Sequence, residues 1–138
     1  MASAAAQIFL DYLKSEGVNA GFIDPEESVV KVGWKLDTTR ISDYIIFDDD
    51  SKYAQIQGHE FIQIPEDKYD IILREINNCN KEYRWAKFYL NEEEGEIVVN
   101  ADAIIQLDSC AEEVDEIMHR LNSIVDDAYP KFMKALWA

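Results

Sequence analysis

The sequence predicts a single α+β domain in which one antiparallel sheet packs against helices. Helical and strand periodicities alternate along the chain, the strands follow one another as hairpins, and 48% of the 138 residues are apolar. A chain of this length and composition can bury its own core without a disulfide or a metal ion. We expect one domain over residues 1–138, with three helices and about five strands in the order α-β-β-β-α-β-β-α.

The first helix is expected over about residues 4–16. Ser3 can cap its N-terminus, and Gly17 can end it in the left-handed conformation. Its apolar face has helical spacing and consists of Ile8, Phe9, Tyr12 and Leu13.

Strand periodicity follows the first helix. A short strand can form at residues 20–23, and a longer one is indicated by the alternating residues Val30, Val32, Trp34 and Leu36. The next strand is expected over 42–47 and ends at the loop Asp48-Asp49-Asp50-Ser51. A third begins at Lys52 and can continue to Ile64.

The second half repeats the alternation of helix and hairpin. Pro65 can open a helix whose apolar stripe is Tyr69, Ile72, Leu73, Ile76, Cys79 and Tyr83. Strands over 84–90 and 96–104 should pair antiparallel through the loop 91–95. Ser109 and Glu112 form the pattern of a capping box that opens the last helix. Pro130 should either kink that helix or make it restart as a short final helix.

The charge of the chain limits its partners. Lys and Arg total 13 against 28 Asp and Glu, which gives a net charge of −15. Such a charge repels nucleic acid and anionic membranes, so we expect neither as a partner. Residues 92–127 hold twelve acidic residues against one basic residue, Arg120. This acidic segment either keeps the protein in solution or steers a basic partner towards it.

The sequence contains no signal for export or membrane insertion. The N-terminus lacks basic residues ahead of its apolar stretch, and no run approaches the ~18 apolar residues of a membrane span. We therefore expect a cytoplasmic protein. Cys79 and Cys110 are expected to be buried thiols rather than a disulfide.

No group of residues predicts a particular chemistry. The two histidines, His59 and His119, lie outside any nucleophile motif, and no glycine-rich phosphate loop exists. Glu116 and His119 have the spacing of half a di-iron site, but the other half is missing. The Asp48-Asp49-Asp50 run lacks the spacing of a calcium-binding EF-hand loop. We expect no enzymatic activity, cofactor or metal; the alternative is a small-molecule or metal-dependent activity near Glu116 and His119.

One face of the predicted sheet has the composition of an interface. Apolar strand residues should face the helices, which leaves aromatic and lysine side chains on the opposite face among glutamines. The candidate partner-binding residues are Lys31, Lys35, Tyr44, Tyr53, Trp85, Lys87 and Tyr89. The alternative is that these long side chains only cover one another across the strands. We expect a protein partner or a homodimer, with a purely structural dimer subunit as a further alternative.

Several short stretches of the second half match a known pattern. They are residues 76–80 (INNCN), 85–90 (WAKFYL), 97–99 (IVV) after a Glu-Gly turn, and 125–130 (VDDAYP). On these stretches, which span about residues 70–138, the chain resembles the YbjN-domain family of bacterial sensory transduction regulators; the first half agrees in element order. The resemblance implies a fold similar to type III secretion chaperones, which are small, acidic, dimeric and non-catalytic. The family has no established catalytic residues to carry over.

Overall fold

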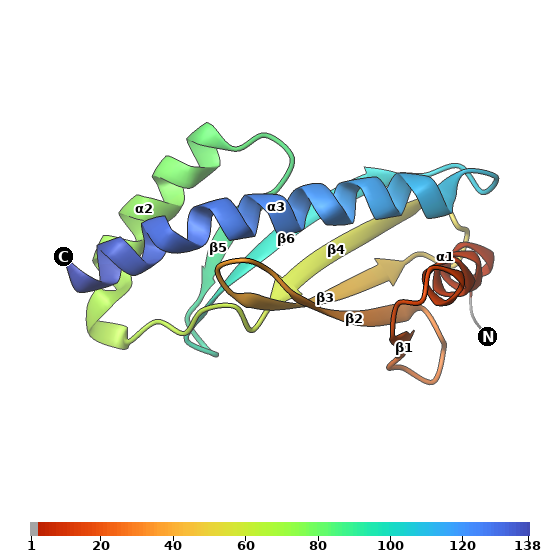
Figure 1. Cartoon of the computed structure of the whole chain (residues 1–138), viewed down its shortest axis with the longest axis horizontal. Helices are drawn as coiled ribbons and strands as arrows, with labels where there is room; N and C mark the ends of the chain where they lie inside the picture. The colour runs from red at the N-terminus through yellow and green to blue at the C-terminus, as the bar shows by residue number, and fades with distance from the viewer. Residues whose placement is uncertain (1–2) are drawn as a thin grey trace.

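The computed structural model describes residues 3–138 and has the predicted α+β architecture, with three α-helices and one antiparallel sheet (Figure 1). Residues 1–2 of the expected domain lie outside the described residues. The sheet has six strands in the order β1-β2-β3-β4-β6-β5. The elements are α1 (Ala4–Ser15), β1 (Ala20–Phe22), β2 (Val29–Lys35), β3 (Arg40–Phe47), β4 (Tyr53–His59), the 3₁₀ turn η1 (Glu66–Lys68), α2 (Tyr69–Glu82), β5 (Lys87–Asn91), β6 (Glu96–Ile104) and α3 (Cys110–Trp137).

Helix α1 begins at the predicted residue and ends one residue before the predicted end. The Ser3 hydroxyl accepts a hydrogen bond from the Ala6 N–H, which satisfies one of the free donors of the first turn. Gly17 follows the helix with a φ of +77°, a conformation that glycine adopts without steric cost.

The short strand at Ala20–Phe22 forms, and it pairs with β2 to give six strands rather than five. The loop between β3 and β4 is the predicted hairpin loop. Asp48 Oδ1 accepts hydrogen bonds from the N–H groups of Lys52 and Tyr53 at 2.8 and 2.9 Å, which closes the turn. The Asp48 carboxylate is therefore hydrogen-bonded to the backbone of its own loop.

Strand β4 is shorter than the sequence suggests, because it ends at His59 and does not continue to Ile64. Glu60 has a φ of +65°, which breaks the extended conformation. Its N–H leaves the strand ladder and donates to the Glu96 carboxylate at 2.9 Å. The apolar residues beyond Glu60, which are Phe61, Ile62 and Ile64, are buried in a loop. Strand β5 likewise begins at Lys87, three residues later than expected.

Helix α3 differs from the prediction at two points. It runs through Pro130 as one element to Trp137, so of the two alternatives at this proline the restart as a separate final helix is wrong. Ala128 and Phe132, on either side of the proline, are fully buried, and this packing holds the helix together where one hydrogen bond is lost. The capping box does not form: Ser109 makes no side-chain capping bond. Glu113 instead accepts a hydrogen bond from the Gln106 N–H at 2.8 Å.

All three helices bury their apolar stripes in one core on the same face of the sheet (Figure 1). Phe9 of α1, Ile72 of α2 and Met118 of α3 share this core with the inward residues of the strands. Within residues 3–138 no helix lies on the opposite face, which we call the open face. No helix of this part of the chain is long and apolar enough to cross a membrane.

Candidate functional site

The open face displays the side chains that alternate with the core residues of the strands. One row of paired residues crosses five strands at mid-sheet, as the register of the ladders shows. Its members are Lys31, Tyr44, Gln57, Asn100 and Lys87. The sequence therefore predicts the facing of Lys31, Tyr44 and Gln57 correctly.

This face contains a shallow hollow of about 630 Å³. Four parts of the chain form its wall: the β1–β2 connection, the middle of β3, the end of β4 with the residues that follow it, and the β5–β6 turn. The lining residues are Ile23, Val29, Tyr44, Ile46, Gln57, His59, Glu60, Gln63, Asn91, Glu94 and Glu96. The hollow thus combines four apolar or aromatic side chains with seven polar ones, so its lining is more polar than that of most small-molecule sites.

His59 and Glu96 form the polar centre of the hollow. The His59 Nδ1 lies 3.3 Å from Glu96 Oε2, and the Tyr44 ring meets the His59 ring edge to face at a centroid distance of 5.3 Å. The Tyr44 hydroxyl donates to Glu60 at 3.3 Å, and Lys31 Nζ lies 5.4 Å from the centre of the Tyr44 ring. These contacts fix the tyrosine ring at the wall of the hollow.

A chain of amides sets the hydrogen-bonding role of His59. Asp102 Oδ1 accepts from the Gln55 amide at 3.3 Å, and Gln55 Oε1 accepts from the Gln57 amide at 2.8 Å. Gln57 Oε1 is therefore left facing His59 Nε2 at 3.0 Å. Since a carboxylate faces the other ring nitrogen, both nitrogens of His59 point at acceptors.

The remaining predicted residues of this face are spread over the sheet. Tyr89 pairs with Val98, which is fully buried although it lies on the open face and outside the main core. Lys35 lies at the β2–β3 hairpin, and Tyr53 lies at the opposite end of the sheet, paired with the exposed Ile104. The structure therefore gathers Lys31, Tyr44 and the His59 cluster at the hollow and leaves Lys35 and Tyr53 away from it.

Two candidate residues are engaged with the helices. Trp85 precedes β5, and its ring lies 5.0 Å from the Arg120 guanidinium of α3, so its expected place on the open face is wrong. Strand alternation does not apply to Trp85, because this residue lies in the loop between α2 and β5 and not in a strand. Lys87 is exposed, but its amine donates to the Asn80 and Tyr83 carbonyls at the end of α2. The negative end of that helix favours the amine there.

Sequence reasoning did not predict that His59, Glu60 and Glu96 lie together at the hollow. His59 could have been placed on the open face, because it continues the alternation of Tyr53, Gln55 and Gln57 along β4. Nothing local marks Glu96 as its partner, since the two residues are 37 positions apart.

The alternative metal site does not assemble. Glu116 pairs with Arg120 at 2.9 Å, while His119 lies 3.2 Å from Asp115 and packs its ring against Trp34. Across residues 3–138, no group of three His, Cys, Asp or Glu side chains could hold a metal ion. Both cysteines are free and buried, and burial is the main cause that raises the pKa of Cys79 to about 12.

Comparisons with known proteins agree with this architecture. The family model of YbjN, described as "Putative bacterial sensory transduction regulator", matches residues 6–134. The fold is similar to that of a solved structure described as "Crystal structure of YbjN, a putative transcription regulator from E. coli", with a TM-score of 0.65 and 10% sequence identity over 91% of each chain. The search of curated proteins gave no significant match. Because the family model covers nearly the whole chain, this protein belongs to the YbjN family.

Proposed function

We propose that this YbjN-family protein is a non-enzymatic cytoplasmic regulator that binds another protein on the open face of its sheet. The observation that carries the proposal is the hollow of about 630 Å³ on a face that no helix covers within the described chain. The family description as a regulator of sensory transduction supports a role in signalling.

The lining of the hollow favours a protein partner with an apolar anchor. Ile23, Val29 and Ile46 offer apolar surface beside the fixed ring of Tyr44. Tyrosine is enriched at interface centres because its ring buries a large area while its hydroxyl keeps a polar contact. The His59 and Glu96 pair at the centre provides a polar group that selects the orientation of whatever lies on it.

Charge favours a basic partner. The net charge of −15 attracts cations over a distance of about a Debye length, and Glu60, Glu94 and Glu96 border the hollow itself. Such steering raises the rate of association more than it lowers the rate of dissociation. Binding should therefore weaken as the ionic strength increases.

The experiment compares partner capture by three forms of the protein. We expect wild type to capture the partner from a native extract and the double variant Tyr44→Ala/Tyr89→Ala to lose it. Trp85→Ala is the matched control, because Trp85 is an exposed aromatic residue that lies against α3 rather than on the open face. Circular dichroism establishes that each variant is folded.

Sedimentation of the same three proteins distinguishes the kinds of partner. If wild type and Trp85→Ala each sediment as a dimer and the double variant sediments as a monomer, the partner is a second copy of the chain. Equal capture and equal sedimentation of all three forms would contradict the proposal.

A further inference from the structure

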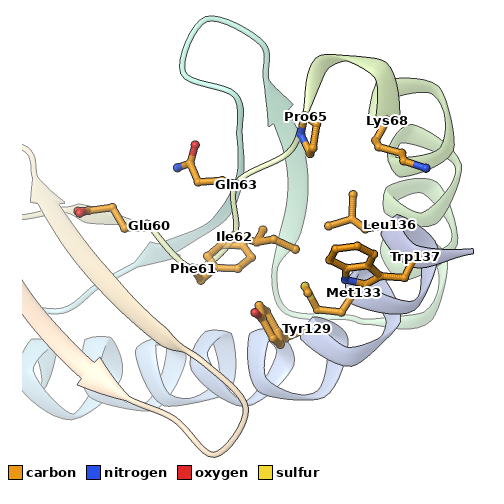
Figure 2. A pocket seen from close by; sticks show the side chains of 10 residues that line it. All are labelled: Glu60, Phe61, Ile62, Gln63, Pro65, Lys68, Tyr129, Met133, Leu136 and Trp137. Carbon is orange, nitrogen blue, oxygen red and sulfur yellow. The ribbon is translucent and has the colours of Figure 1, made fainter.

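A second hollow of about 430 Å³ lies at the C-terminal end of α3 (Figure 2). Its walls are the loop 60–65, the turn η1 and the last turns of α3. This volume lies within the range of small-molecule sites, which is about 300–1,000 Å³.

The loop that forms one wall is held by hydrogen bonds from other parts of the chain. The Phe61 carbonyl accepts from the Thr39 hydroxyl at 3.1 Å, and the Ile64 N–H donates to the Gly95 carbonyl at 2.8 Å. Phe61, Ile62 and Ile64 are buried. A ligand would therefore meet a preformed site and would not have to order the loop.

The inside of this hollow is apolar. Phe61 and Ile62 project from the loop, and Met133, Leu136 and Trp137 face them from α3 (Figure 2). Trp137, the last residue of α3, is 81% exposed. Burying the exposed parts of Met133, Leu136 and Trp137 against an apolar ligand would be favourable.

Three of the polar side chains that line the hollow carry hydrogen-bond donors without partners in the described chain. Lys68 is half-buried, and no carboxylate of residues 3–138 forms an ion pair with it, whereas Lys131 of α3 pairs with Glu82. The Tyr129 hydroxyl and the Trp137 indole N–H also make no hydrogen bond within this range. Both border the hollow (Figure 2).

The acidic side chain that lines this hollow is turned out of it, although Glu66 and Asp67 of η1 lie close by in the chain. Glu60 is its one acidic lining residue, and the Glu60 carboxylate accepts from the Tyr44 hydroxyl on the open face. Figure 2 shows the Glu60 side chain pointing away from the apolar walls. Residues 128–138 carry Lys131 and Lys134 and no acidic residue, in contrast to the acidic chain as a whole.

We propose that this hollow binds a small amphipathic carboxylate. The apolar body lies between the loop 60–65 and the end of α3, and the carboxylate accepts a charge-assisted hydrogen bond from Lys68. The proposal is independent of protein binding on the open face, because the two hollows use different walls apart from Glu60 and Gln63.

Octanoate is a suitable probe, and 1-octanol is its uncharged counterpart. In ¹H–¹⁵N spectra of the labelled protein, octanoate should produce a saturable shift of the Trp137 indole signal. The same spectra should show at least tenfold weaker binding of 1-octanol, because the alcohol cannot use the charge of Lys68.

Variants assign the binding to this hollow. Lys68→Gln should weaken octanoate binding about five- to tenfold and leave the binding of 1-octanol unchanged. Lys134→Gln makes the same change of charge outside the hollow and should bind octanoate like the wild type. The proposal is overturned by the absence of saturable octanoate binding, by equal affinity for the alcohol, or by equal effects of the two lysine substitutions.

Discussion

Asp43 of β3 lies beside Asn122 of α3 in the core between the sheet and the helix. Both are buried, and neither the Asp43 carboxyl oxygens nor the Asn122 amide oxygen has a hydrogen-bond partner of ordinary geometry among residues 3–138. Burial raises the pKa of Asp43 to about 8, and the neighbouring Asn122 side chain lowers it only in part. At neutral pH Asp43 is therefore mostly protonated in the folded protein.

This pair predicts how stability depends on pH. The folded protein keeps the Asp43 proton up to about pH 8, whereas the unfolded chain loses it near the ordinary value of 3.8. The contribution of Asp43 to the free energy of unfolding is therefore complete below pH 3.8. It falls by about 1.4 kcal/mol for each pH unit above that value and is lost once the pH has risen through about 8. Asp43→Asn should remove this slope and should be more stable than wild type at pH 8 in urea unfolding.

A matched control for this prediction is Asp49→Asn, which makes the same change of charge in the exposed β3–β4 loop. Its stability should follow the pH dependence of the wild type. A difference between wild type and Asp43→Asn that is the same at pH 5 and pH 8 would contradict the assignment of the proton.

Gly58 of β4 is predicted to tolerate no side chain. A Cβ atom there would lie 2.5 Å from Ile41 Cδ1 and 2.6 Å from Val99 Cγ1, both in the packed core. Gly58→Ala should therefore lower the free energy of unfolding by about 1–3 kcal/mol. The control is Gly33→Ala in β2 of the same sheet, where a Cβ atom would meet nothing within 4 Å. Equal urea midpoints for the two variants would contradict the close packing at Gly58.

The local pattern of the sequence was sufficient to predict the facing of most strand residues. Val30 and Val32 of β2 and Ile45 of β3 are buried, because a period of two places alternate residues on one face. The same pattern failed beyond Glu60. Phe61, Ile62 and Ile64 are apolar enough to resemble a strand, but the positive φ of Glu60 turns the chain away from the sheet.

The hollows could not be predicted, because they depend on which strands become neighbours. Strand β6 lies between β4 and β5, and this order brings Glu96 beside His59 and Gly95 beside Ile64. No local propensity encodes a pairing between residues so far apart in the chain. Trp85 was misplaced for a related reason, since its position is set by Arg120 of α3 and not by strand alternation.

Asp126 of α3 is predicted to attach the helix to the β2–β3 hairpin. Its Oδ1 accepts from the Thr38 N–H at 2.7 Å and from the Thr38 hydroxyl at 2.6 Å. These bonds lower the pKa of Asp126, so the stabilisation is present above the ordinary aspartate range and is lost as the pH falls through the lowered value. Asp126→Ala should cost about 1 kcal/mol at pH 7, an estimate reduced for solvent exposure.

A double-mutant cycle with Thr38→Ala isolates the side-chain part of this contact. The two substitutions should be less than additive in urea unfolding at pH 7, because each removes the same hydroxyl–carboxylate bond. Strict additivity would show that the two side chains do not interact in solution.

Glu96 is predicted to hold the loop that the two hollows share. Its carboxylate accepts from the Glu60 N–H at 2.9 Å and faces His59 Nδ1 at 3.3 Å, so both oxygens are used as acceptors. A glutamine has one acceptor oxygen and would direct its NH₂ group at one of these two donors. Glu96→Gln should therefore speed amide hydrogen exchange at Glu60 and Phe61 and lower stability by about 1–3 kcal/mol.

Glu94→Gln is the control for this effect, because it removes a charge from the same β5–β6 turn without touching the Glu60 N–H. If Glu96 orders the loop, its substitution alone should also weaken octanoate binding, since Phe61 and Ile62 form one wall of the second hollow. Unchanged exchange at Glu60 and Phe61 in Glu96→Gln would mean that the loop is held by Thr39 and Gly95 alone.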